Sequence, residues 1–127
     1  CQAVMTAKLS CVLLVAFLCL FCGVATSHPV DDLIKKSKVL VFSKSYCGFS
    51  MATKGLLEGK GVQFEKVELN EIPEGAEWQN YLHQMTGQRT VPNTFIGGKH
   101  IGGNSELQTL ESSGQLNAKL REAGVSV

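Results

Sequence analysis

Cysteine is scarce beyond the start of this chain. Four of its five cysteines lie within the segment 1–22, and Cys47 is the one cysteine that follows them. A lone thiol excludes a disulfide within the rest of the chain, and it also excludes a structural zinc site, which takes several cysteine or histidine ligands. Any disulfide that Cys47 forms therefore needs a thiol from another molecule.

The chain also lacks an excess of charge. Lys and Arg number 12 against 11 Asp and Glu, a formal net charge of +1. Nucleic acids and charged membrane surfaces attract strongly basic patches, so this balance argues against either partner once the segment 1–27 is removed. The sequence has no internal repeat, no low-complexity stretch beyond that segment and no Asn-x-Ser/Thr glycosylation site.

The segment 1–27 has the pattern of a secretory signal peptide. Met5 is the expected start, Lys8 supplies the charge, and an apolar stretch over 11–22 leads to the small residues Ala25-Thr26-Ser27. That stretch is shorter than the roughly 20 apolar residues of a membrane-spanning helix. We predict a signal peptide at 1–27, one domain at 28–127, and a location in the secretory pathway or outside the cell. An uncleaved membrane anchor and a mistranslated or fragmentary leader are the alternatives.

Residues 28–127 alternate strand and helix patterns with short connections, which predicts one small α/β domain. Four consecutive apolar residues at 39–42 are typical of a strand buried on both faces. The predicted elements, in chain order, are helix 30–38, strand 39–42, helix 47–60, strand 62–69, a helix ending at Gly87, a hairpin of strands 91–96 and 99–101, and helices 106–112 and 115–123.

Cys47 lies between a predicted strand and a predicted helix, in the segment Lys44-Ser45-Tyr46-Cys47-Gly48-Phe49-Ser50. The first amides of a helix and a nearby lysine favour thiolate over thiol, so this position predicts a nucleophile at neutral pH. Ser50 stands where a Cys-x-x-Cys pair has its second thiol, so no disulfide forms there. A reactive cysteine at the first strand-to-helix junction predicts a thioredoxin-like fold, with a central four-stranded mixed sheet flanked by helices.

Four segments carry a resemblance to a known family. They are Cys47-Gly48-Phe49-Ser50, Thr86-Gly87-Gln88-Arg89-Thr90-Val91-Pro92, Gly97-Gly98-Lys99-His100-Ile101-Gly102-Gly103 and Ser113-Gly114-Gln115-Leu116. In this order and spacing the chain resembles a glutaredoxin over residues 30–123. The resemblance implies a thiol–disulfide oxidoreductase that uses glutathione, with Cys47 as its catalytic residue.

The resemblance also implies a glutathione site around Cys47. Pro92 matches the family's cis-proline, which leaves the backbone groups of Val91 free to pair with glutathione like an added strand. Residues 102–105 begin a predicted helix, whose free amides would bind the γ-glutamyl carboxylate. Lys44 and Gln79 match positions that hold the glycine carboxylate. The implied glutathione-binding residues are Lys44, Tyr46, Gln79, Thr90, Val91, Pro92, Gly103, Asn104 and Ser105.

Two classes of the family are combined in this chain. Cys-Gly-Phe-Ser at 47–50 is the signature of the monothiol class associated with iron–sulfur clusters, whereas the surroundings are those of the dithiol class, which normally reads Cys-Pro-Tyr-Cys. The monothiol class generally has an inserted loop and a Trp-Pro before the cis-proline, and both are absent here, which favours catalysis. Gly48 in place of proline favours a cluster, because it frees the turn.

Three functions follow. The first is a glutathione-dependent oxidoreductase, a monomer that adds glutathione to proteins or removes it from glutathionylated proteins through Cys47 by a monothiol route. The second is a homodimer that binds a [2Fe–2S] cluster through Cys47 of each chain and the thiols of two glutathiones. The third is a secreted interaction protein that has kept the fold and lost the chemistry.

Other side chains of this sequence are predicted to be structural. Phe49, Trp78 and Tyr81 are expected to pack rather than to bind a ligand, although Phe49 would lie near the bound thiol. His83 and His100 have no partner at metal-site spacing, so we predict that they are surface or hydrogen-bonded histidines.

Overall fold

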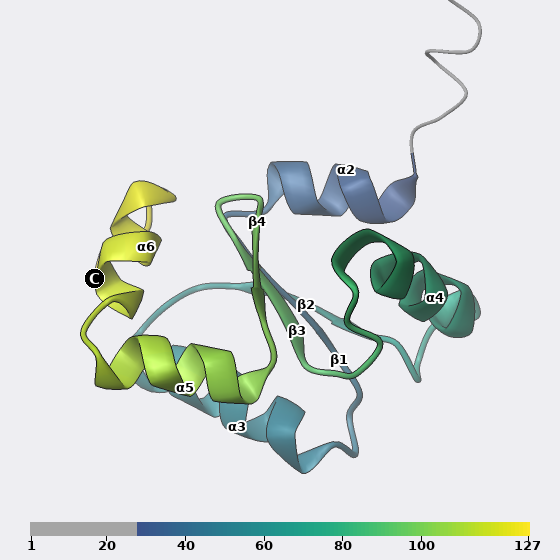
Figure 1. Ribbon diagram of the computed structural model, residues 1–127, viewed down its shortest axis with the longest axis horizontal. Helices are drawn as coiled ribbons and strands as arrows, with labels where there is room; N and C mark the ends of the chain where they lie inside the picture. Colours follow the sequence, from purple (N-terminus) through teal and green to yellow (C-terminus); the bar gives the residue numbers. More distant parts are fainter. Residues whose placement is uncertain (1–27) are drawn as a thin grey trace, which may run out of the picture.

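The computed structural model describes residues 28–127, whose centre is a four-stranded mixed sheet (Figure 1). The strands are β1 (Val39–Ser43), β2 (Glu65–Glu68), β3 (Asn93–Ile96) and β4 (Lys99–Gly102), in the spatial order β2-β1-β3-β4. β1 pairs in parallel with β2 and antiparallel with β3, which pairs antiparallel with β4. The predicted α/β fold is confirmed.

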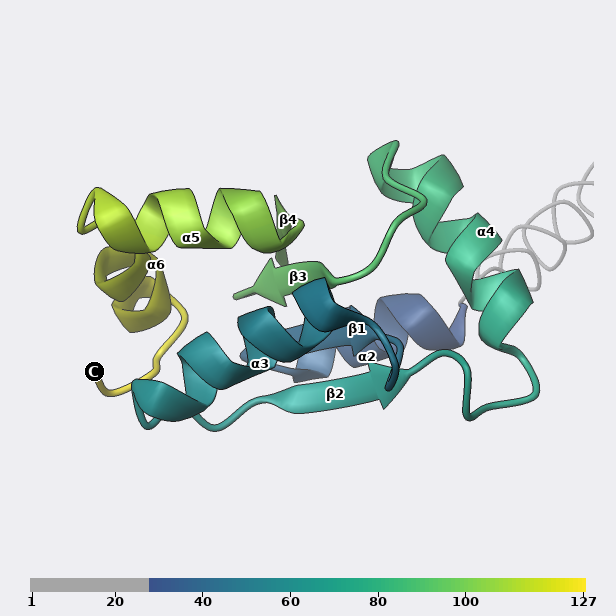
Figure 2. The same ribbon diagram turned by 90° about the horizontal axis from the view of Figure 1, so that it is seen from below.

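Helices cover both faces of the sheet. α2 (Pro29–Lys36) and α4 (Gly75–Thr86) lie on one face, and α3 (Gly48–Gly59) and α5 (Asn104–Ser112) lie on the other, with α6 (Leu116–Glu122) at the far end of α5 (Figures 1 and 2). Each predicted helix is present, with ends shifted by at most two residues. Gly87 ends α4 in the left-handed conformation, at φ 80°, that favours glycine after a helix.

The central strand β1 is buried on both faces, as predicted. Val39 and Val41 belong to the core beneath α3, α5 and α6, whereas Leu40 and Phe42 belong to the core beneath α2 and α4. All four side chains are at most 1% exposed. Successive side chains of a strand point to opposite faces, so a run of apolar residues fills both cores. Full burial of each such side chain contributes about 1.5–3 kcal/mol.

The strand predicted at 62–69 is shorter than expected. β2 spans Glu65–Glu68, and the register pairs these residues with 40–43 of β1. Val62 precedes the strand and packs into the core at 4% exposed, in a turn where its amide donates to the carbonyl of Leu57. The predicted strand was too long because Val62 is apolar. That residue is buried in a loop and does not pair in a strand.

The predicted hairpin is present, but its first strand begins at Asn93 rather than at residue 91. Pro92 has no N–H to donate to a strand ladder, so regular pairing starts after it. Gly97 and Gly98 have φ values of 60° and 80°, which the tight turn between β3 and β4 requires.

The start of the described chain is attached to α4. His28 caps α2, since its Nδ1 atom accepts a hydrogen bond from the amide of Val30 at 3.1 Å. Its ring stacks on Tyr81 at a centroid distance of 3.7 Å. Tyr81 and Trp78 pack against the core beneath α4, as predicted.

The predicted signal peptide, its start at Met5 and its cleavage after Ser27 lie outside the described residues and stay predictions. Within 28–127, no helix is long and apolar enough to cross a membrane. The secretory location likewise stays a prediction.

One buried ion pair lies where β1 and β2 end. Nζ of Lys54 on α3 lies 2.8 Å from Oε1 of Glu68, and the hydroxyl of Ser43 donates to the same oxygen at 2.7 Å. The Lys54 and Glu68 side chains are 14% and 10% exposed. Burial raises the pKa of Glu68, but the bonds from Lys54 and Ser43 outweigh it, so this pKa is lowered from its ordinary 4.5.

We expect Lys54→Met to destabilise the fold by about 3 kcal/mol, because it leaves the Glu68 carboxylate buried without its cation. Urea unfolding at pH 7 measures the loss. Lys36→Met, which removes an exposed lysine of α2, is the control and should change the stability by less than about 0.5 kcal/mol.

The pH dependence of that loss provides a second check. Because the pKa of Glu68 is lowered in the folded state, its contribution is present above the unfolded-state pKa and disappears as the pH falls through the folded-state pKa. The difference between wild type and Lys54→Met should therefore shrink in acid. A difference that stays constant with pH would contradict the role given to the pair.

Candidate active site

Cys47 occupies the N-cap position of α3. Its backbone is extended, with φ −87° and ψ 121°, and its amide donates to the carbonyl of Lys44 at 3.0 Å. The side chain is half-buried, and its sulfur lies 3.8 Å from the carbonyl oxygen of Val91. The thiol is thus at the positive end of a helix, where the sequence predicted it, and remains reachable from solvent.

The pKa of the Cys47 thiol is lowered from its ordinary 9.0. The hydroxyl of Ser50 contributes most; burial acts in the opposite direction, and the amides of Ser50 and Phe49 and the charge of Lys44 lower the pKa further. The Ser50 side chain is 0% exposed, and its oxygen has no hydrogen-bond partner of standard geometry among the described residues. The thiolate of Cys47, one turn earlier, can accept a hydrogen bond from this hydroxyl. Such a bond favours the ionised form of Cys47.

The buried face of α3 has polar as well as apolar side chains. The inward residues are Ser50, Thr53 and Leu57, whereas Phe49 is 69% exposed. The prediction that Phe49 is a packing residue is therefore wrong. Phe49 instead lines a groove together with residues 86–92 and 103–106.

The segment before β3 forms one wall of the site. The peptide bond between Val91 and Pro92 is cis, as the resemblance implied. The side-chain amide of Gln88 donates to the carbonyl of Thr90 at 3.0 Å and to that of Pro92 at 2.8 Å. One side chain therefore holds the backbone on both sides of Val91.

The start of α5 forms the opposite wall. Gly103 is the N-cap residue, so the amides of Asn104 and Ser105 in the first turn have no acceptor within the helix. The side-chain oxygen of Asn104 accepts a hydrogen bond from the hydroxyl of Thr53 at 3.0 Å. This bond links α5 to α3, the helix that begins at Cys47.

A groove of about 770 Å³ runs between these walls. In both ribbon views the start of α3, the segment before β3 and the start of α5 lie at the same end of the sheet (Figures 1 and 2). Of the residues implied by the resemblance, those that line the groove are Thr90, Val91, Pro92, Gly103, Asn104 and Ser105.

Three of the implied residues lie outside the groove lining. Lys44 is half-buried and Tyr46 is 71% exposed, both in the turn before Cys47. The side-chain amide of Gln79 donates to the carbonyl of Arg89 at 2.8 Å. The structure thus gives Gln79 a contact with the chain itself. The ligand roles of all nine implied residues stay predictions.

Several groove residues were not assigned to the site from the sequence: Phe49, Gln88, Arg89, His100 and Glu106. Polar residues such as Gln88 and Arg89 have no periodic signature that distinguishes them from solvated side chains. His100 is hydrogen-bonded, as predicted, with its Nε2 atom 2.8 Å from Oδ1 of Asn93, and burial lowers its pKa.

Glu106 places a carboxylate at the start of α5. Its pKa is lowered mainly by the hydroxyl of Ser105, which donates to it at 2.6 Å, and also by the amides of Glu106 itself and of Gly103. A glutamate three residues after the N-cap that reaches back to the cap amide forms half of a capping box. The spacing of Glu106 from Gly103 was the signal in the sequence that could have placed this carboxylate at the helix start.

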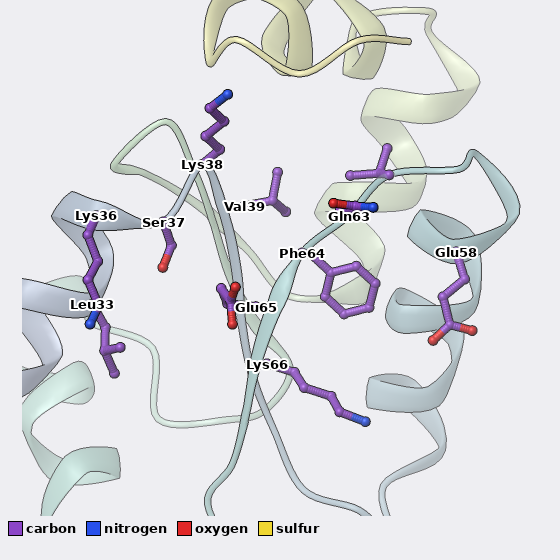
Figure 3. A pocket seen from close by; sticks show the side chains of 11 residues that line it. Leu33, Lys36, Ser37, Lys38, Val39, Glu58, Gln63, Phe64, Glu65 and Lys66 are labelled. Atoms are coloured by element: carbon purple, nitrogen blue, oxygen red, sulfur yellow. The ribbon is translucent and has the colours of Figure 1, made fainter.

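A larger hollow lies away from Cys47. It measures about 940 Å³ and lies between the start of β1, the end of α3 and β2 (Figure 3). The side chains of Lys36, Lys38 and Lys66 point in different directions there, so they do not converge on one anion. Within 28–127 no group of three or more His, Cys, Asp or Glu side chains could hold a metal ion. The smaller groove beside Cys47 is therefore the candidate active site.

Comparison with known proteins agrees with this geometry. The family model described as glutaredoxin matches residues 39–101. The chain is 45% identical over 94 residues to a glutaredoxin from Vernicia fordii, an alignment that covers 74% of this chain and 90% of that relative. The chain belongs to the glutaredoxin family.

Solved glutaredoxins share its thioredoxin-like fold. The crystal structure of a buckwheat glutaredoxin–glutathione complex superposes on this glutaredoxin with a TM-score of 0.74 and 41% identity, over 75% of this chain and 86% of that chain. The sequence is also 42% identical over 102 residues to the chloroplastic monothiol glutaredoxin-S12 of Arabidopsis thaliana, which covers 80% of this chain and 57% of that relative.

We expect Ser50→Ala to raise the pKa of Cys47 toward 9.0, because the Ser50 hydroxyl is the main group that lowers it. The pH profile of iodoacetamide alkylation measures the change, and its midpoint should move upward. At acid pH, where Cys47 is protonated, stability should stay the same or rise, since the variant removes a buried hydroxyl without a standard partner. Ser112→Ala, on the exposed face of α5, is the control, and a midpoint that does not move would contradict the role of Ser50.

Gly48 begins α3, and a Cβ added there would meet no atom within 4 Å. Proline is favoured at the first helical position, and Cys47 already has the extended backbone that a following proline requires. We expect Gly48→Pro to raise the free energy of unfolding by about 0.4–1 kcal/mol, because it restricts the unfolded chain. Urea unfolding checks this against Gly55→Pro, inside α3, which should lose about 3 kcal/mol or more. A destabilised Gly48→Pro would refute the argument.

Proposed function

We propose that this glutaredoxin is a glutathione-dependent thiol–disulfide oxidoreductase that exchanges glutathionyl groups through Cys47 by a monothiol route. The observation that carries the proposal is a thiol with a lowered pKa that lies 3.8 Å from the carbonyl oxygen of Val91, a residue of the groove lining. The complex of the buckwheat relative with glutathione supports glutathione as the ligand.

The groove offers complementary groups to the parts of glutathione. The backbone of Val91 would pair with the tripeptide as an added strand. The amides of Asn104 and Ser105 would receive the γ-glutamyl carboxylate at the positive end of α5. The carboxylate of Glu106 at the same end would attract the neighbouring α-ammonium group.

The glycine carboxylate of glutathione would lie at the other end of the groove. Arg89 lines the groove and supplies a positive charge there. Lys44 and Gln79 are the residues that the resemblance assigns to the same carboxylate, with Tyr46 beside the sulfur. Gln79 would act together with Arg89, since its amide already holds the carbonyl of that residue.

The reaction proceeds in two thiol–disulfide exchanges. The Cys47 thiolate attacks the glutathionyl sulfur of a protein–glutathione disulfide; a new S–S bond forms on Cys47, the old one breaks, and the protein leaves as a thiolate that takes a proton from water. The thiolate of a second glutathione then attacks the sulfur of glutathione bound to Cys47. Glutathione disulfide leaves, and the Cys47 thiolate is restored.

The monothiol route follows from Ser50. Its hydroxyl cannot displace a substrate from Cys47, so a second glutathione must do so. Removal of glutathione should therefore be efficient, and direct reduction of protein disulfides by a dithiol route should be poor. The monomer suffices for this chemistry, because one chain supplies both the thiol and the groove.

The iron–sulfur alternative fits the residues less well. The described chain offers Cys47 as its one thiol, so a [2Fe–2S] cluster would need a second chain and two glutathione thiols. In its favour, Gly48 leaves the turn beside Cys47 open, with no atom near its missing Cβ. Visible absorption after anaerobic reconstitution with iron, sulfide and glutathione, together with dimer formation, tests this alternative.

We place the activity in the secretory pathway or outside the cell, on the pattern of the segment 1–27. Such compartments are more oxidising than the cytosol, and thiol–disulfide exchange runs in either direction according to the ambient potential. The protein would then add glutathione to protein thiols as well as remove it.

The deciding experiment is glutathione-dependent turnover of a glutathionylated peptide by the purified protein, with Cys47→Ser beside it. We expect steady turnover in the wild type and only the uncatalysed background in the variant, because serine replaces the nucleophile at nearly the same size. A folded wild type that neither turns over the peptide nor binds glutathione would refute the proposal and favour the interaction protein.

A further inference from the structure

We propose that Gln88 is a positioning residue, whose side-chain amide sets the orientation of the Val91 backbone toward the groove and so aligns the glutathionyl group with Cys47. The inference rests on the proposed function, because it concerns how the groove holds glutathione.

Two bonds from one planar group carry the argument. The amide of Gln88 donates to the carbonyl of Thr90 at 3.0 Å and to the carbonyl of Pro92 at 2.8 Å. A carbonyl and the N–H that follows it lie in one peptide plane, so the first bond also fixes the direction of the Val91 N–H. The second bond fixes the carbonyl of Pro92, the residue after Val91. The backbone of Val91 is therefore held from both sides by a single side chain.

Val91 is the residue of this segment that faces the nucleophile. Its carbonyl oxygen lies 3.8 Å from the sulfur of Cys47. The carbonyl of Arg89, two residues earlier, is held by the side-chain amide of Gln79 at 2.8 Å. The segment is thus held by side-chain amides on both sides of Val91, whose backbone groups would pair with glutathione under the proposed function.

Gln88 also reaches toward the opposite wall. A Cβ added to Gly103 would lie 3.8 Å from the side-chain amide nitrogen of Gln88. The amide therefore lies against the N-cap residue of α5 as well as within the segment before β3. A change at Gln88 would alter the spacing between the two sets of backbone groups that bind glutathione.

Loss of these bonds should affect recognition of glutathione rather than the reactivity of the thiol. The groups that lower the pKa of Cys47 are the Ser50 hydroxyl, the amides of Ser50 and Phe49, and Lys44, and Gln88 is not among them. A variant without the amide should therefore keep its alkylation profile.

The test compares two disulfides of one peptide in single-turnover reactions with the reduced protein. The cysteine of the peptide is linked either to glutathione or to 2-mercaptoethanol, and release of the peptide thiol is followed. Gln88→Met should slow the reaction with the glutathionylated peptide about tenfold, which corresponds to about 1.4 kcal/mol, and should leave the other reaction within about twofold.

Two further variants make the comparison specific. Gln88→Arg keeps N–H donors in a planar group, so it should restore the rate with the glutathionylated peptide to within about threefold of wild type. Gln84→Met makes the same chemical change at an exposed position of α4 and should leave both rates unchanged. If circular dichroism shows that Gln88→Met does not fold, Gln88→Glu replaces it, since glutamate has the same size and no amide donor.

The outcomes separate this inference from the proposed function. If the variant without the amide reacts as fast as wild type, or slows equally with both disulfides, Gln88 has no positioning role, and the proposed function stands. If the wild type does not distinguish the glutathionylated peptide from the 2-mercaptoethanol disulfide, the proposed function itself fails.

Discussion

The active site depends on the enclosure of β1. Both edges of this strand are paired, with β2 and β3, and both of its faces are covered by core side chains, so it cannot shift without breaking two ladders and two cores. Cys47 follows β1, and Pro92 precedes β3, its antiparallel neighbour. The nucleophile and the wall that faces it therefore meet at one end of the sheet because the two strands that lead to them are paired.

Features that local chemistry determines could be predicted from the sequence. The buried strand at 39–42 is evident from four consecutive apolar residues, and the hairpin turn from Gly97-Gly98, which tolerate positive φ. The position of Cys47 before a helix followed from the pattern on either side of it. The cis state of Pro92 and the roles of residues 103–105 came from the family resemblance, since nothing in their spacing alone indicates a ligand.

Features that depend on contacts between distant parts of the chain were missed. The sequence did not indicate that Ser50 would lie inward and Phe49 outward, because a buried serine has no apolar signal and an aromatic residue at a helix start is expected to pack. Gln79 and Gln88 bind carbonyls in the segment before β3, and a polar side chain has the same appearance in the sequence whether it binds water or backbone. The predicted strand includes Val62 because a residue that is buried in a loop is apolar, just as a residue of a buried strand is.

The lowered pKa of Cys47 also links the redox state of the protein to its resistance to unfolding. A fold that lowers the pKa of a thiol is itself stabilised when that thiol ionises. This gain in the free energy of unfolding is fully present above the unfolded-state pKa of Cys47, and it is lost as the pH falls through the folded-state pKa. Glutathionylated Cys47 has no thiol to ionise, so it receives none of that gain. In alkaline solution a mixed disulfide at Cys47 would therefore remove this contribution to stability, and cleavage of that disulfide would restore it.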